Sequence, residues 1–347
     1  MRGSVYEDSN KVLLRIMMAI IEVNNLTKHY TTYQKEPGVG ASLLSLVHRK
    51  GLLTKAAESV SFTIEEGELV GFIGPNGAGK TTVLKCLSGI LTPNSGNVSI
   101  LGFNPSDREN EYRRQIGFVT GQKNQLFWDL PPIETFYLNR DLYEIENSRF
   151  SDNLQYFVAL LQVSDIIKTP TRKLSLGERM KCEIIAALLH EPKVLFLDEP
   201  TIGLDVLAQK NIREFLYEYN LRTKATIILT SHSMQDVKKL CKRIIIINKG
   251  IIIYDGSLED VITRYEETKR ISVTLTEEVG ERTLTLFKHE LIEYNFPIAH
   301  FSIERKKTPL FVEKLLKNLP VSDLNVEELP LEEAISNIFI TDVQSHP

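Results

Sequence analysis

The chain has 347 residues, of which 42% are hydrophobic and 25% charged, as in an ordinary water-soluble globular protein. Its formal net charge of −4 gives no support for general nucleic-acid binding, which would favour a basic chain. No apolar run reaches the roughly 18 residues that a membrane-spanning helix needs. The length suits one large domain and a smaller one.

The first part of the chain predicts strands separated by an insertion. We expect residues 1–17 to be an N-terminal extension and residues 20–24 to form the first strand. Residues 31–56 carry scattered prolines and glycines, so we expect a loop insertion with one short helix at Ser42–Val47. The alternating polar and apolar residues Ser59–Ile64 predict the next strand.

A glycine-rich stretch follows the apolar run Leu69–Ile73 and precedes a segment with helical periodicity. The stretch fits the pattern G-x-x-x-x-G-K-[ST] in its usual strand–turn–helix context, which predicts a polyphosphate site. Glycines let backbone N–H groups approach an anion, and the helix N-terminus attracts the same charge. Lys80 would neutralise the β- and γ-phosphates, the Thr81 hydroxyl would ligate Mg²⁺, and Thr82 would contact the α-phosphate. The residues of the stretch are Gly74, Pro75, Asn76, Gly77, Ala78, Gly79, Lys80, Thr81 and Thr82.

Residues 124–190 change character and predict mostly helix. The aromatic cluster Leu126–Pro132, with Phe127 and Trp128, is either core or an exposed apolar patch that a partner covers. Further on, Ser175 precedes an apolar helical segment and Glu178 stands three residues later, which predicts a capping box. The same helix N-terminus could instead face a phosphate, and the two uses compete for the same hydroxyl and N–H groups.

Two acidic residues end the apolar run Val194–Leu197, which predicts a strand buried on both faces of a parallel sheet. Their carboxylates would lie at the carboxyl edge of the sheet, where open α/β sheets bind ligands. Asp198 would hold Mg²⁺, directly or through water. Glu199 would polarise the attacking water as a general base.

Three side chains elsewhere could either bind the nucleotide or its metal, or have only a structural or solvent-exposed role. Tyr30 could stack on a purine or simply pack at a strand end, with Tyr33 as the second stacking candidate. Gln122 at a strand end could ligate Mg²⁺ and orient water, or be a solvated loop residue. His232 follows the buried strand Ala225–Thr230 and could contact the γ-phosphate or cap a helix.

The last part of the chain lacks a nucleotide motif. A hairpin is predicted from Arg243–Ile247 and Ile251–Tyr254, followed by a helix from about Leu258 to Thr268. Residues beyond it predict a small regulatory or oligomerising domain with an α/β pattern. Its expected strands are Ile271–Leu275 and Thr283–Phe287, and its expected helices are Pro309–Asn318 and Leu331–Phe339.

Taken in chain order, these motifs closely resemble those of the ATP-binding cassette (ABC) ATPases. The ordered set is Gly74–Thr82, Gln122, Leu174–Glu178, Asp198–Glu199, Asp205 and His232. The resemblance implies an α/β P-loop NTPase cassette over residues 18–266. That cassette would have an antiparallel β subdomain and an inserted helical subdomain at about 124–190. A small C-terminal α/β domain would follow at 267–347.

The resemblance also implies how the chain would work. Two cassettes, as a homodimer or a paired cassette, would sandwich two ATP molecules with Mg²⁺ head to tail. In the family's L-S-G-G-Q motif this chain carries Leu176 and Glu178 at two positions, while Ser175 and Gly177 are kept. By resemblance, one cassette would supply the residues that bind and hydrolyse its own ATP, namely Lys80, Thr81, Gln122, Asp198, Glu199 and His232. The opposite cassette would contact the same ATP through Ser175, Gly177 and the adjacent Glu178. Asp205 would lie at the interface between the two cassettes, and Tyr30 would stack on the adenine.

Within the family, the chain is similar to ATPase subunits of bacterial exporters that act with a separate permease. Residues Gln122–Thr135, with Phe127 and Trp128, would then receive the permease, and the subunit would lie peripherally on the cytoplasmic face of the cell membrane. The alternative is a non-transport cassette ATPase acting on ribosomes or DNA. A cassette that binds ATP without turnover is a third reading, and the intact Glu199 and His232 argue against it.

Overall fold

The computed structural model describes residues 19–33, 51–121, 124–266, 268–328 and Ile335. It divides into two units, Met1–Gly256 and Ser257–Pro347, which we describe separately. Four of the expectations above lie outside the described residues, wholly or in large part. They are the N-terminal extension, the helix at Ser42–Val47, the loop residue Gln122 and most of the helix at Leu331–Phe339.

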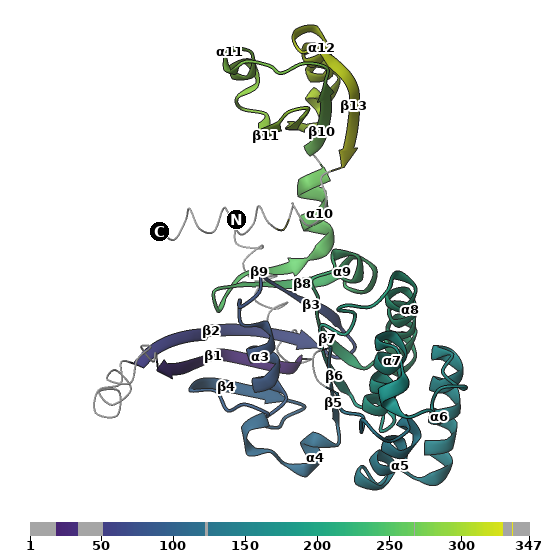
Figure 1. The fold of residues 1–347 in the computed structure, drawn as a ribbon. Coiled ribbons are helices and arrows are strands. Elements are labelled where there is room, and N and C mark those ends of the chain that lie inside the picture. The colour runs from purple at the N-terminus through teal and green to yellow at the C-terminus, as the bar shows by residue number, and fades with distance from the viewer. Residues whose placement is uncertain (1–18, 34–50, 122–123, 267, 329–334, 336–347) are drawn as a thin grey trace, which may run out of the picture. The chain divides into compact units, whose positions relative to one another are not determined.

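A six-stranded sheet forms the centre of the first unit, with strand order β5-β6-β7-β3-β8-β9 (Figure 1). The pairs β3/β7, β3/β8, β5/β6 and β6/β7 are parallel. Every residue of β6 and β7 is buried, as expected for apolar strands covered on both faces. The strands are β3 (Leu69–Ile73), β5 (Ile116–Thr120), β6 (Val194–Asp198), β7 (Thr226–Thr230), β8 (Arg243–Asn248) and β9 (Ile251–Ser257), so the predicted hairpin is confirmed.

A second sheet is antiparallel and has the order β2-β1-β4. Its strands are β1 (Ala19–Tyr33), β2 (Gly51–Glu65) and β4 (Ser95–Ile100). Since β1 pairs with β2 as far as Tyr33 opposite Gly51, the prediction of a loop throughout 31–56 is wrong at both ends. The β-prone residues Thr31–Tyr33 extend the strand because a partner strand supplies their hydrogen bonds, and a single sequence does not reveal that partner.

One apolar core joins the two sheets through helix α3 (Lys80–Leu87). Val83, Leu84 and Leu87 on this helix are fully buried. They belong to the same cluster as Phe62 of the antiparallel sheet and Phe72 of the parallel sheet. This packing fixes the start of α3 beside the carboxyl end of β3.

Helices α5 (Pro132–Leu142), α6 (Asn147–Leu161) and α7 (Leu176–Leu188) lie between β5 and β6 in the chain and gather on one side of the unit (Figure 1). The predicted helical character of residues 124–190 is therefore confirmed. Helices α8 (Val206–Thr223) and α9 (Met234–Leu240) follow β6 and β7. A short helix, α4 (Asn110–Arg113), precedes β5. No helix in the described ranges combines the length and apolarity that crossing a bilayer requires.

The second unit begins with α10 (Leu258–Glu266) and continues as an antiparallel sheet of order β11-β12-β10-β13. Its β-α-β-β-α-β succession with this strand order is the ferredoxin-like arrangement. Alternate residues of β10 and β12 are buried against α12, as period-two patterning predicts. The elements are β10 (Thr268–Leu275), α11 (Glu281–Leu284), β11 (Leu291–Asn295), β12 (Ile298–Glu304), α12 (Thr308–Asn318) and β13 (Val321–Glu328).

One predicted element of this unit is wrong. Thr283–Phe287 was expected to be a strand, but α11 ends at Leu284 and a 3₁₀ turn covers Thr285–Phe287. The alternating Thr and Leu residues fit a strand, yet the buried Phe287 packs against Phe301 and Phe311 from this short helical segment. Tertiary packing thus overrides a pattern too short to decide between the two periods.

Candidate functional site

The glycine-rich loop between β3 and α3 is shaped by close backbone packing. A Cβ on Gly79, whose φ is 109°, would lie 2.0 Å from the Ala56 carbonyl oxygen. Gly77 also has a positive φ, of 78°, but nothing lies within 4 Å of the place where its Cβ would be. The loop is therefore packed closely at its end and open at Gly77, where a ligand can approach the backbone.

Lys80 opens α3 and is only 5% exposed. Its Nζ donates to the carbonyl oxygens of Gly74 at 2.6 Å and Pro75 at 3.1 Å. Burial lowers the pKa of the Lys80 ammonium, and the nearby carboxylates of Glu199 and Asp198 oppose that shift. The cation thus lies across the loop, held by groups that a phosphate oxygen can replace as acceptor.

Asp198 is the buried last residue of β6 and accepts two hydroxyl hydrogen bonds at the same oxygen, Oδ1. Thr81 Oγ1 donates to it at 3.0 Å and Thr230 Oγ1 at 2.8 Å. This cluster of carboxylate and hydroxyl oxygens is the donor chemistry that suits Mg²⁺. Thr230 is not among the predicted site residues, although its place at the end of the strand beside β6 could have indicated it.

Glu199 has a left-handed backbone, with φ of 55°, which is uncommon for a residue with a side chain. Its N–H donates to Thr230, both to Oγ1 at 3.0 Å and to the carbonyl oxygen at 3.1 Å. Its Oε1 lies 2.7 Å from Nε2 of His232. The conformation is kept by bonds to β7, and conformational strain of this kind concentrates at functional sites.

Gly121 packs against the same turn. Its N–H donates to the Asp198 carbonyl oxygen at 2.9 Å, and a Cβ there would lie 2.3 Å from the Glu199 carbonyl oxygen. Beside Glu199 and His232 a cavity of about 270 Å³ opens, lined further by Thr201, Ile202, Gly203, Gln209, Ser231 and Ser233. Glu199, predicted as the general base, and His232 therefore line one cavity.

The start of α7 forms a second cluster. Ser175 caps the helix: its Oγ accepts from the Glu178 N–H at 3.3 Å, and Glu178 Oε2 accepts from the Ser175 N–H at 2.8 Å. The predicted capping box is confirmed. Gly177 faces the first turn of α8, where a Cβ would lie 2.9 Å from the Cβ of Ala208. Asp205 caps α8 by accepting from the Ala208 N–H at 2.9 Å.

Tyr30 lies within β1, opposite Thr54, and the residue is 37% exposed. Lys28 Nζ lies 5.8 Å from the centroid of the Tyr30 ring. A partly exposed aromatic ring beside a cation offers a face for stacking, so its assignment to an adenine stays a prediction. Gln122 and any metal role for it lie outside the described residues.

Comparison with known proteins identifies the family to which the chain belongs. Residues 57–202 match the model of the ABC transporter family. The chain is 34% identical over 212 residues to the ABC transporter ATP-binding protein NatA of Bacillus subtilis, covering 61% of this chain and 86% of NatA. It is 30% identical to the linearmycin resistance ATP-binding protein LnrL of the same species, over 81% of this chain and 92% of LnrL.

A solved structure of an ATP-binding subunit of an ABC transporter has a TM-score of 0.59 and 26% identity, covering 71% of this chain and 93% of that one. The chain therefore belongs to the ABC transporter ATP-binding proteins, and it is an ATPase with the fold of an ATP-binding cassette. The fold expected from the sequence is confirmed.

Proposed function

We propose that this chain hydrolyses ATP to drive a separate membrane permease, working as a pair of cassettes on the cytoplasmic face of the membrane. The observation that supports this most directly is the meeting of Lys80, Thr81, Asp198, Glu199 and His232 at one edge of the parallel sheet. These residues come from three distant stretches of the chain. They supply a cation, an oxygen-rich metal site and a candidate base.

In each cassette, Lys80 exchanges its two carbonyl acceptors for β- and γ-phosphate oxygens. Thr81 and Asp198 would hold Mg²⁺, which supplies charge neutralisation at those phosphates when bound. A water held by Glu199 attacks the γ-phosphorus, its proton passes to the carboxylate, and the bond to the β-phosphate oxygen breaks. His232, 2.7 Å from Glu199, keeps that carboxylate in place.

The second cassette completes the site. In this proposal Ser175 and Gly177 of one copy face the γ-phosphate bound by its partner, and Asp205 lies at the seam. Support comes from α7 itself, a helix whose N-terminus attracts anions and whose N-cap residue Ser175 is exposed, with Glu178 half-buried beside it. The Glu178 side chain must then move, because its carboxylate already accepts both Ser175 donors.

A permease would bind at the exposed apolar residues that follow the loop of Gln122. Phe127 is 48% exposed, Trp128 51% and Leu130 46%, and they are consecutive or nearly so in the chain. Exposed apolar side chains that cluster in this way are typical of protein contact surfaces. Leu126 of the same cluster is buried and belongs to the core, so the proposed partner surface consists of the exposed Phe127, Trp128 and Leu130.

The direction of transport is proposed as export. The match to LnrL, a resistance protein by its name, covers 81% of this chain, whereas Met1–Gly256 makes up about 74% (256 of 347 residues). The likeness therefore extends into the second unit. Vesicles carrying the permease inside out should accumulate the substrate on adding ATP, and loss of preloaded substrate would instead indicate uptake by the cell.

The test of the whole proposal is ATP turnover with Mg²⁺, measured for the chain alone, with the multi-span membrane protein encoded by a neighbouring reading frame, with ribosomes and with DNA. Stimulation by the membrane protein alone is expected. Stimulation confined to ribosomes or DNA would replace the proposal with the non-transport alternative. Absence of turnover in all four mixtures would remove the catalytic assignment.

A further inference from the structure

A buried carboxylate on α7 is used neither by the phosphate site nor by the helix cap. Glu183 is 3% exposed and lies two turns after Ser175. Both of its oxygens accept the Gln125 N–H, at 2.9 and 3.0 Å, and Oε1 also accepts the Leu126 N–H at 3.2 Å. A side chain of the helix thus binds the backbone of a loop 57 and 58 residues away.

Burying a carboxylate at this position lowers the free energy of unfolding, because its neighbours in the chain, Cys182, Ile184 and Ile185, are fully buried and water is excluded. Burial raises the pKa of the Glu183 carboxyl, while the Leu126 and Gln125 N–H groups and the charge of Arg179 lower it. An apolar residue would fill the same space without that cost. What the carboxylate adds is the attachment of two backbone donors of the loop, the N–H groups of Gln125 and Leu126, to one helix.

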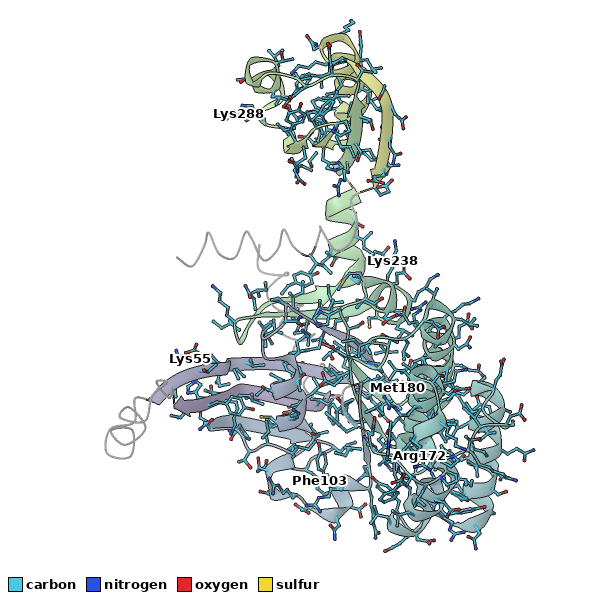
Figure 2. The ribbon with its side chains drawn as sticks, in the orientation of Figure 1. Lys55, Phe103, Arg172, Met180, Lys238 and Lys288 are labelled. Atoms are coloured by element: carbon cyan, nitrogen blue, oxygen red, sulfur yellow. The ribbon has the colours of Figure 1, made fainter. Side chains whose placement is uncertain are left out.

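The loop that Glu183 holds is bonded to the same helix region at its other end. The Trp128 carbonyl oxygen accepts from the Arg172 N–H at 3.0 Å. The Leu130 carbonyl oxygen accepts from Thr171, from N–H at 3.0 Å and from Oγ1 at 2.8 Å. Figure 2 labels Arg172 and Met180, which lie on either side of Ser175 along the chain.

We propose that Glu183 is a positioning residue that makes residues 125–130 and the start of α7 one mechanical unit, so that contact at Phe127 and Trp128 reorients Ser175. The loop is bonded at Gln125 and Leu126, before Phe127, and again at Trp128 and Leu130. Along the chain, Ser175 lies between the residues that make these bonds, Thr171–Arg172 and Glu183. The Arg179 guanidinium, 5.8 Å from the Trp128 ring, adds a third connection. The part that concerns a permease rests on the proposed function.

The first test uses hydrogen exchange on the wild-type chain. The Gln125 and Leu126 amides should exchange as slowly as those of the buried turns of α7, and residues 125–130 and 171–178 should change protection together when a membrane partner binds. Fast exchange at Gln125 and Leu126, or protection of one segment without the other, overturns the proposal. This measurement needs no variant to fold.

The second test uses Glu183→Gln, which places an amide donor against the two N–H donors, with Glu214→Gln on the exposed face of α8 as the matched control. We expect kcat to fall by roughly tenfold, the equivalent of one lost charge-assisted hydrogen bond, with KM for ATP unchanged. Glu183→Asp should recover part of the loss. Equal falls in kcat and nucleotide affinity would indicate a merely structural role and overturn the proposal.

The partner arm separates this inference from the proposed function. If the membrane protein stimulates the wild type and Glu183→Gln alike, the inference fails and the proposed function stands. If it stimulates neither, the proposed function fails, while exchange at Gln125 and the kcat of Glu183→Gln still decide the role of Glu183.

Discussion

The phosphate edge of the sheet and the start of α7 are built in opposite ways. Lys80, Asp198 and His232 meet only after distant strands pair. Asp198 accepts a hydrogen bond from Thr230 of β7, and His232 contacts Glu199 after β6. Ser175 and Glu178 bond each other across three residues of one helix turn. The first cluster needs the whole sheet to form, whereas the second is satisfied within one helix turn. In the proposed function, the second cluster takes part in catalysis only at the site of a partner cassette.

The largest expected effect lies in the first cluster. Glu199→Gln should lower ATP turnover by at least about a hundredfold, because the amide cannot accept the proton of the attacking water. Nucleotide affinity should stay as it is, since Lys80 and Thr81 are untouched. Steady-state turnover and a nucleotide titration measure the two effects. Near-normal hydrolysis by the variant would remove Glu199 from the reaction.

Lys80→Ala should act one step earlier, on binding. Loss of a charge-assisted contact to phosphate should weaken nucleotide affinity by roughly ten- to a hundredfold. Lys85→Ala, in the last turn of the same helix, is the matched control and should bind normally. If Lys80→Ala binds nucleotide as tightly as the wild type, Lys80 does not contact the phosphates and keeps its bonds to the Gly74 and Pro75 carbonyl oxygens.

The contrast between the clusters also explains what the sequence could predict. The α7 capping box was predicted in full because it involves only four consecutive residues. The loop around Lys80 and the acids after β6 were found because their order along the chain is characteristic. Thr230 and Glu183 were missed because each acts on a segment 31 or more residues away, which only the fold brings close.

The same reasoning covers the misassigned elements. The end of β1 and the start of β2 depend on pairing across residues 34–50, so scattered glycines and prolines nearby gave the wrong boundary. The helical turn at Thr283–Phe287 depends on the ring of Phe287 meeting Phe301 and Phe311. The strand β6 was predicted because burial on both faces leaves a continuous apolar run. The helix α7 was predicted because a capping box precedes its apolar segment.

Ser175→Ala tests whether Ser175 acts on the ATP bound by its own copy or on the ATP bound by the partner copy. Cap loss should cost about 1 kcal/mol of stability, and Asn104→Ala, which removes another cap, controls for that. Turnover should fall by roughly tenfold, as expected when one charge-assisted hydrogen bond to phosphate is lost. Nucleotide affinity of the single copy should be kept.

Mixing makes the test decisive, because Lys80→Ala and Ser175→Ala copies can form a pair with one intact site. In a random one-to-one mixture, half of the pairs are mixed and about a quarter of all sites are intact. Turnover should rise well above the sum of the two variants. A merely additive mixture would place Ser175 in the same copy as Lys80, and the contrast drawn between the clusters would be lost.

The smallest effect concerns Glu178, whose carboxylate stands where a partner's γ-phosphate would approach. Glu178→Gln keeps the capping box, because glutamine also accepts the Ser175 N–H. It removes one negative charge worth roughly 1 kcal/mol at a surface, so ATP-dependent pairing should tighten by about fivefold. Glu134→Gln, in the first turn of α5, controls for loss of a favourable helix-dipole charge. Weaker pairing, measured by sedimentation with ATP, would mean that Glu178 serves the partner contact itself rather than the cap alone.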